Sequence, residues 1–169
     1  MKKRLFAVML IALLLCGCGG KSEPAEPAQN AAPDCTFYDL DGNAHTLSEF
    51  AGKPVILNFW ASWCNPCKSE MPDIEAAYKE YGDRIQFLIV NLTDGSTETV
   101  QSASEYIAGK RYTFPVFYDT DMSGAVAYQV TSIPITYFID AQGNIVAYAS
   151  GMMSASRLQS GIDLLLGEG

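Results

Sequence analysis

Apolar residues gather along the chain in short runs separated by polar turns, and their spacing predicts strands alternating with helices. Two mostly apolar runs, at residues 55–60 and 86–92, predict buried strands. Two further pairs of runs are separated by turn residues, Asp41-Gly42-Asn43 and Ala141-Gln142-Gly143-Asn144, and predict β-hairpins. We expect their strands at residues 36–40 with 44–47 and at residues 135–140 with 145–150.

Helical spacing of apolar positions fills most of the stretches between those strands. Residues 64–81 predict a helix broken by Pro72, and residues 97–108 predict a helix ended by Gly109. Residues 123–128 predict a short helix, and residues 154–166 predict a closing helix with Ser154 as a candidate cap. The remaining apolar triplet, residues 116–118, is expected to form a short edge strand or an extended loop.

The order of these elements predicts an α/β domain. Strands that alternate with helices pair in parallel through right-handed crossovers, and the last hairpin adds an antiparallel edge. The result is a mixed sheet covered by helices on both faces, with an additional β-hairpin at its N-terminal side.

The first residues have the pattern of an export signal rather than of the fold. Three cations, Lys2, Lys3 and Arg4, precede an apolar run at residues 5–15 that is too short to span a membrane. The segment Leu15-Cys16-Gly17-Cys18 resembles a bacterial lipobox, in which Cys18 fits the lipidated position better than Cys16. The alternative is an ordinary cleaved signal with incidental cysteines. We therefore expect a lipoprotein signal peptide at residues 1–17.

The residues after Cys18 are mostly Gly, Ser, Glu, Pro and Ala, which cannot bury apolar surface. We expect a lipidated cysteine and a disordered tether at residues 18–33, followed by a single domain at residues 34–169. The protein would then be extracytoplasmic and anchored to the bacterial membrane by lipid. Loss of the three N-terminal cations takes the formal net charge from −8 to −11. Because there is no basic stripe, nucleic acid is not an expected partner. We expect the protein to be a monomer.

The candidate chemistry lies in Cys64-Asn65-Pro66-Cys67, which follows a predicted strand and opens a predicted helix. Two thiols at this spacing can close into a disulfide, and a helix N-terminus stabilises a thiolate. The competing interpretation is half of a structural zinc site. It lacks a second ligand pair, because only Cys35 and His45 remain as spare ligands outside the signal segment. A redox-active dithiol is favoured, with neither a metal nor a cofactor.

This architecture and several motifs together resemble thioredoxin, and more narrowly the TlpA/ResA-like extracytoplasmic thiol-disulfide oxidoreductases. The matching stretches are Ala32-Pro33-Asp34, residues 52–60, the Cys-x-x-Cys motif, Glu70-Met71-Pro72 and residues 133–143. The resemblance implies a thioredoxin-like fold and a membrane-tethered enzyme that reduces disulfides of exported proteins, such as cysteines for haem attachment. It also implies a membrane thiol-disulfide protein as electron donor.

The resemblance and the helix geometry assign a role to each site residue. Cys64, expected to be the exposed thiol, would attack a substrate disulfide, and Cys67 would resolve the mixed disulfide. Glu70 lies one helical turn after Cys67 and would accept its proton with a raised pKa. The alternative for Glu70 is a solvated carboxylate on the helix surface.

Three further residues are expected to bind substrate. Trp63 would contact it beside the dithiol, and Pro134 corresponds in the resemblance to the cis-proline that packs on the active-site disulfide. The backbone of Ile133 could then pair with a substrate segment. The alternative for Pro134 is a trans proline that begins a strand. Cys35 is interpreted as a buried, inert thiol, with a third redox-active thiol as the alternative.

Two other functions stay open at this stage. A peroxiredoxin-like thiol peroxidase would share the fold, but the region before Cys64 lacks the expected Thr and Arg. A non-enzymatic binding lipoprotein would use the Cys64–Cys67 bridge as a static staple.

Overall fold

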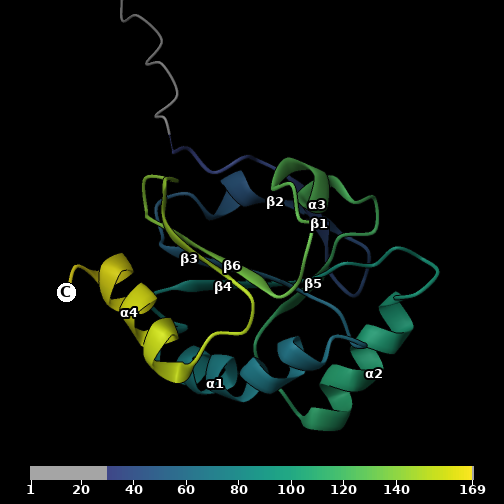
Figure 1. Ribbon diagram of the computed structural model, residues 1–169. Helices are drawn as coiled ribbons and strands as arrows, with labels where there is room; N and C mark the ends of the chain where they lie inside the picture. The colour runs from purple at the N-terminus through teal and green to yellow at the C-terminus, as the bar shows by residue number, and fades with distance from the viewer. Residues whose placement is uncertain (1–29, 169) are drawn as a thin grey trace, which may run out of the picture.

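The arrangement of the strands confirms the expected mixed α/β fold. The computed structural model describes residues 30–168, in which one seven-stranded sheet has the order β2-β1-β5-β4-β3-β6-β7 (Figure 1). The strands are β1 (Thr36–Tyr38), β2 (Ala44–Thr46), β3 (Val55–Trp60), β4 (Gln86–Asn91), β5 (Val116–Tyr118), β6 (Ile135–Ile139) and β7 (Ile145–Ser150). The helices are the 3-10 turn η1 (Leu47–Phe50), α1 (Asn65–Tyr81), α2 (Val100–Lys110), α3 (Ser123–Ala127) and α4 (Ala155–Leu166).

The sheet is parallel at its centre and antiparallel at both sides. β3, β4 and β5 run in parallel, and β6 pairs with β3 in the opposite direction. The N-terminal hairpin joins the sheet where Tyr38 of β1 pairs with Tyr118 of β5. Residues 116–118 therefore form an interior strand, and the expectation of an edge strand or loop was wrong. The reason is that β1 covers the outer side of β5.

Alternate residues of β3 enter two separate apolar cores. Ile56 and Trp60 pack with α1, α2 and α4 on one face, while Leu57 and Phe59 pack with the α3 region and η1 on the other. Asn58 lies between Ile56 and Trp60 in this alternation, so its side chain enters the face covered by α1. The period of two in β3 thus brings one polar side chain towards the helix that carries the disulfide.

Two helices differ from their predicted form. α1 continues through Pro72 instead of breaking there. A proline removes only one backbone donor, and the turns around it are fixed by Met71 and Ile74, which are buried against the sheet. Helix α2 runs to Lys110 and ends at Arg111 in the left-handed conformation, so Gly109 is not its stop.

The start of α2 also differs from the prediction. It begins at Val100 rather than at residue 97, with Thr99 and Ser102 forming a reciprocal cap. The preceding residues form a turn instead, because the carboxylate of Asp94 accepts hydrogen bonds from the backbone N–H groups of Ser96, Thr97 and Glu98. Asp94 thus satisfies three N–H groups within the turn, and α2 begins only after it, where Thr99 supplies the cap.

The described chain begins at the end of the sheet where β3 starts. The N–H of Ala32 donates to the carbonyl of Gly143 (2.8 Å), and the N–H of Ile145 donates to the carbonyl of Asn30 (2.8 Å). Asn30 and Ala32, at the start of the described residues, thus already hydrogen-bond to the domain upstream of the boundary predicted at residue 34. The predicted signal peptide, Cys18 and the tether up to residue 29 lie outside the described residues. Within residues 30–168, no helix has both the length and the apolar character needed to cross a bilayer.

Candidate active site

The two cysteines of the predicted dithiol are joined as a disulfide, Cys64–Cys67, where β3 passes into α1. Cys64 caps the N-terminus of α1, and its sulfur accepts a hydrogen bond from the N–H of Cys67 (3.2 Å). Pro66 occupies the first turn, where a missing N–H costs nothing. The sulfur of Cys64 therefore lies at the positive end of the helix, as the sequence predicted.

Cys64 is less exposed than expected. Its exposed fraction is 4 %, against 1 % for Cys67, so the order of the two thiols is as predicted but the outer one is also enclosed. One cause is the loop before β6, because the carbonyl oxygen of Ile133 lies 3.8 Å from Cys64 Sγ. The two residues next to Cys64 in sequence are exposed to solvent: Trp63 is 57 % exposed, and Asn65 is exposed as well.

The loop in front of Cys64 has the conformation that the resemblance implied, since the Ile133–Pro134 peptide bond is cis. The carbonyl of Pro134 accepts a hydrogen bond from the N–H of Gly151 (2.9 Å), which fixes the end of β7 beside this loop. The next residue, Met152, is 54 % exposed. An exposed apolar side chain that the sequence analysis did not select therefore borders the site together with Trp63.

Glu70 is a buried carboxylate and not a solvated residue of the helix surface. Its exposed fraction is 2 %. Oε1 accepts a hydrogen bond from Asn58 Nδ2 (2.9 Å), and Oε2 accepts one from the N–H of Met153 (2.8 Å). Burial raises the pKa of Glu70 above its ordinary value, although these two hydrogen bonds act in the opposite direction. An acid that can hold a proton thus lies one turn behind Cys67.

Asn58 connects this acid to the sheet. Its amide nitrogen also donates to Thr136 Oγ1 (2.8 Å), which lies directly opposite on β6, while its own Oδ1 is buried with no hydrogen-bond partner among residues 30–168. Sequence reasoning noted Asn58 only as a neutral residue and missed Thr136. The sequence did contain a signal: Asn58 and Thr136 are polar residues within the apolar strands β3 and β6. Both lie on the face of the sheet that meets α1.

A second buried carboxylate fixes the segment just before Cys64. Glu98 is 1 % exposed and accepts hydrogen bonds from both the N–H (3.1 Å) and the hydroxyl (2.8 Å) of Ser62. Asn91 Nδ2 at the end of β4 donates to the same carboxylate (3.0 Å). Glu98 was not predicted, because in the sequence it stands among polar residues at the start of the helix expected at residues 97–108. It holds the backbone two positions before Cys64.

Comparisons with known proteins agree with this site. Residues 28–148 match the model of the AhpC/TSA family. The chain belongs to the AhpC/TSA family. It is 34 % identical to the thioredoxin-like protein YneN of Bacillus subtilis over 170 residues, covering 97 % of this chain and 99 % of that protein. It is 30 % identical over 175 residues to the thiol-disulfide oxidoreductase ResA of the same organism, with 97 % and 94 % covered.

A solved structure with the same fold is the pneumococcal exposed lipoprotein thioredoxin Etrx1 of Streptococcus pneumoniae. It shares 32 % identity and a TM-score of 0.66, and the match covers 77 % of this chain and 98 % of that one. Within the AhpC/TSA family, the ResA-like relatives and the Cys64–Cys67 bridge identify the enzyme class as thiol-disulfide oxidoreductase.

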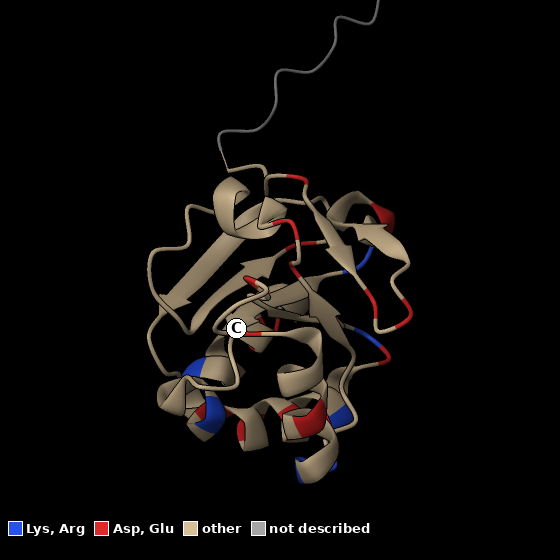
Figure 2. Cartoon of the chain, turned by 90° about the vertical axis from the view of Figure 1, so that its right-hand side faces the viewer, with Lys and Arg blue, Asp and Glu red and all other residues tan. Residues whose placement is uncertain are grey.

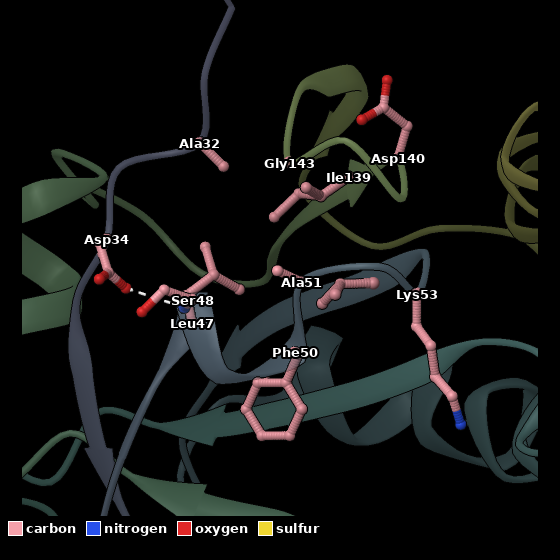
Figure 3. Close-up of a pocket in the computed structure, with 11 residues that line it drawn as sticks. Ala32, Asp34, Leu47, Ser48, Phe50, Ala51, Lys53, Ile139, Asp140 and Gly143 are labelled. Carbon is pink, nitrogen blue, oxygen red and sulfur yellow. Dashed lines mark hydrogen bonds between the residues drawn. The ribbon is translucent and has the colours of Figure 1, made fainter. Parts of the chain in front are cut away.

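Other candidate groups of this family member lie away from the bridge or lack reactivity. Cys35 is buried, and burial together with Asp119 and Asp34 raises the pKa of its thiol to about 12, so the thiol stays protonated. Residues 30–168 contain no cluster of three or more His, Cys, Asp or Glu side chains able to hold a metal ion. A hollow of about 200 Å³ lies where the N-terminal segment, η1 and the β6–β7 turn meet, at the opposite end of β3 (Figure 3).

Proposed function

We propose that this protein reduces disulfides of exported proteins outside the cytoplasm while tethered to the membrane by lipid. The observation that carries the proposal is the position of Cys64: its sulfur caps α1 and lies 3.8 Å from the carbonyl of Ile133. A substrate strand that pairs with this backbone would bring its own sulfur to Cys64. Trp63 next to Cys64 and Met152 next to Gly151, both exposed, offer apolar contacts to such a strand.

The reaction follows from the two sulfurs and the nearby acid. In the reduced enzyme the thiolate of Cys64 attacks one sulfur of the substrate disulfide, and the other substrate sulfur leaves as a thiolate that takes up a proton. Cys67 then attacks the sulfur of Cys64, which releases the second substrate thiol and forms the Cys64–Cys67 bridge. Glu70 accepts the proton of Cys67 in this second step. The substrate gains two electrons, so a membrane thiol-disulfide protein must reduce the bridge again.

The anchor in this proposal is a lipid on Cys18. The lipobox-like segment before Cys18 supports it, and so does the similarity to Etrx1, which is described as an exposed lipoprotein. A diacyl anchor supplies the two hydrophobic chains that stable membrane attachment takes. Replacing Cys18 with Ala should move the mature protein from the membrane fraction to the soluble fraction, with Cys16→Ala as the matched control. Equal membrane retention of both variants would contradict lipidation at Cys18.

Trapping in the host tests the function directly. The full chain with Cys67→Ser lacks the resolving thiol, so Cys64 should stay covalently bound to its substrates. We expect mass spectrometry to identify exported proteins with cysteine pairs, such as haem-attachment or metal-centre proteins. The control is the Cys64→Ser/Cys67→Ser variant, which should trap nothing. The proposal is contradicted if both variants give the same adducts, or if Cys64→Ala retains full disulfide-reducing activity.

A further inference from the structure

A groove beside the active-site disulfide separates the start of α1 from the end of α2. It has a volume of about 470 Å³. The residues lining it include Asn65, Lys68, Ser69, Tyr106, Lys110 and Tyr112. Asn65 follows Cys64 directly, and the N–H of Lys68 donates to the carbonyl of Cys64 (3.1 Å). The groove therefore begins at the helical turn that carries the nucleophilic sulfur.

Two lysines lie over a single aromatic ring in this groove. Lys68 Nζ is 5.9 Å from the centroid of Tyr106, and Lys110 Nζ is 6.0 Å from the same centroid. Neither ammonium group lies within 4.0 Å of a carboxylate among residues 30–168. Two positive charges near one ring, with no carboxylate of residues 30–168 paired to either, attract an anion to this groove.

The surrounding protein does not supply this anion. Burial raises the pKa of Tyr106 to about 12 and also raises that of Tyr112, so both phenols stay neutral. Glu75, whose charge also contributes to the raised pKa of Tyr112, is already occupied by hydrogen bonds from Thr113 and an ion pair with Lys79. Figure 2 shows acidic positions scattered over the chain and fewer basic ones. In a chain of net charge −8, this groove is a local concentration of unneutralised positive charge.

We propose that this groove binds a carboxylate side chain of the substrate protein, a few residues from the cysteine that Cys64 attacks. The proposal rests on the proposed function and adds a substrate preference to it: disulfides flanked by Asp or Glu react fastest. The carboxylate lies between the two lysines while the substrate sulfur meets Cys64. Complementary charge of this kind raises the rate of productive encounter more than it raises affinity.

Synthetic peptides with an internal disulfide test the preference. Three peptides differ only in one residue beside the cysteine pair, which is Glu, Gln or Lys. The fully reduced enzyme is mixed with each peptide, and the second-order rate of peptide dithiol formation is measured by acid quench and chromatography. We expect the Glu peptide to react about fivefold faster than the Gln peptide at low salt, and the Lys peptide to react more slowly than either. High salt should shrink the difference.

A matched pair of double variants separates the groove from net charge. Lys68→Gln/Lys110→Gln should bring the ratio of Glu to Gln rates close to one. Lys53→Gln/Arg84→Gln removes the same charge just before the starts of β3 and β4, at the end of the sheet away from Cys64. This variant should keep the ratio. Because each ratio compares two substrates of one enzyme, changes in the reactivity of Cys64 cancel.

Each outcome distinguishes the preference from the function itself. Equal Glu and Gln rates with the wild-type enzyme would overturn the groove proposal, and so would loss of the ratio in both double variants. If the wild-type enzyme reduces the Gln peptide and Cys64→Ser does not, the proposed function stands whatever the ratio. If the wild-type enzyme reduces none of the peptides, the proposed function fails first.

Discussion

The backbone N–H of Met153 donates a 2.8 Å hydrogen bond to the carboxylate of Glu70, a residue 83 positions earlier in the chain. The same segment contacts the loop before β6, because the N–H of Gly151 donates to the carbonyl of Pro134. Three residues after β7 therefore connect the acid behind Cys67 with the loop in front of Cys64. The proposed proton acceptor and the proposed substrate-binding loop are thus held by the same short segment.

Glu70→Gln should slow the second step of disulfide reduction. Glutamine has nearly the same size but cannot take up the proton of Cys67 at neutral pH. We expect the mixed disulfide to accumulate and the rate of its resolution to fall by about tenfold or more. Single-turnover reduction of a peptide disulfide, quenched at intervals and resolved by mass, measures both. Glu80→Gln, an exposed position of the same helix, is the control, and equal resolution rates in the two variants across pH would remove Glu70 from the mechanism.

The stability of the oxidised protein should depend on pH through Glu70. Its pKa is raised in the folded state above the ordinary value of 4.5. Between these two values the unfolded chain has lost the proton and the folded chain keeps it, so stability falls as pH rises through this window. Above the folded-state pKa, the contribution of Glu70 to stability no longer changes with pH. A tenfold change in this ionisation equilibrium corresponds to about 1.4 kcal/mol.

Urea unfolding of the wild type and of Glu70→Gln in parallel isolates this effect. The difference in unfolding free energy, wild type minus variant, should decrease with rising pH above 4.5. Other titrating groups are common to both proteins and cancel. A difference that stays constant with pH would show that Glu70 titrates normally.

Asn58→Asp should move the pH dependence of exchange upwards. The new carboxylate would lie about 3 Å from Glu70 Oε1, where Asn58 Nδ2 now donates. Two carboxylates at this separation share one proton, so the pKa of the pair's second ionisation rises. We expect the midpoint of the pH–rate profile to rise by about one pH unit or more. Asn58→Leu, which removes the donor without adding charge, should move it less, and identical midpoints would contradict the coupling.

Glu98 should support activity through geometry rather than through charge. Glu98→Ala leaves the N–H of Ser62 and the amide of Asn91 without their acceptor, at a cost of about 2–4 kcal/mol in unfolding free energy. We expect kcat/KM to fall several-fold because the segment before Cys64 loosens. Glu98→Gln keeps one acceptor oxygen, and the hydroxyl of Ser62 can turn to accept from its amide. Its stability should stay within about 1 kcal/mol of the wild type, with near-normal kinetics, and equal losses in both variants would point to the charge instead.

The sequence was sufficient to predict the sheet, its hairpins and the position of the dithiol. The apolar runs at β3 and β4, the turn residues and the Cys-x-x-Cys spacing are local signals, and each maps to an observed element. The errors came from tertiary contacts. Residues 116–118 became an interior strand only because β1 pairs beside them, and α1 stays continuous at Pro72 because its neighbouring turns are buried.

The site was harder to predict where it depends on partners distant in sequence. The motif placed Glu70 near Cys67, but nothing in the sequence indicated the N–H of Met153, since a backbone donor has no side-chain signature. Glu98 was missed for a related reason. Its neighbours in sequence are polar, and only the fold brings it to Ser62.

The position of Asn30 determines where the enzyme can be attached to a solid support. The hydrogen bonds of Asn30 and Ala32 lie where β3 begins, and Cys64 follows its other end, about 20 Å away for a strand of this length. A bead, electrode or fusion protein joined directly to Asn30 would thus lie at the end of the sheet where β3 begins, away from Cys64. Immobilisation at Asn30 should therefore leave the Cys64–Cys67 dithiol accessible to a protein in solution.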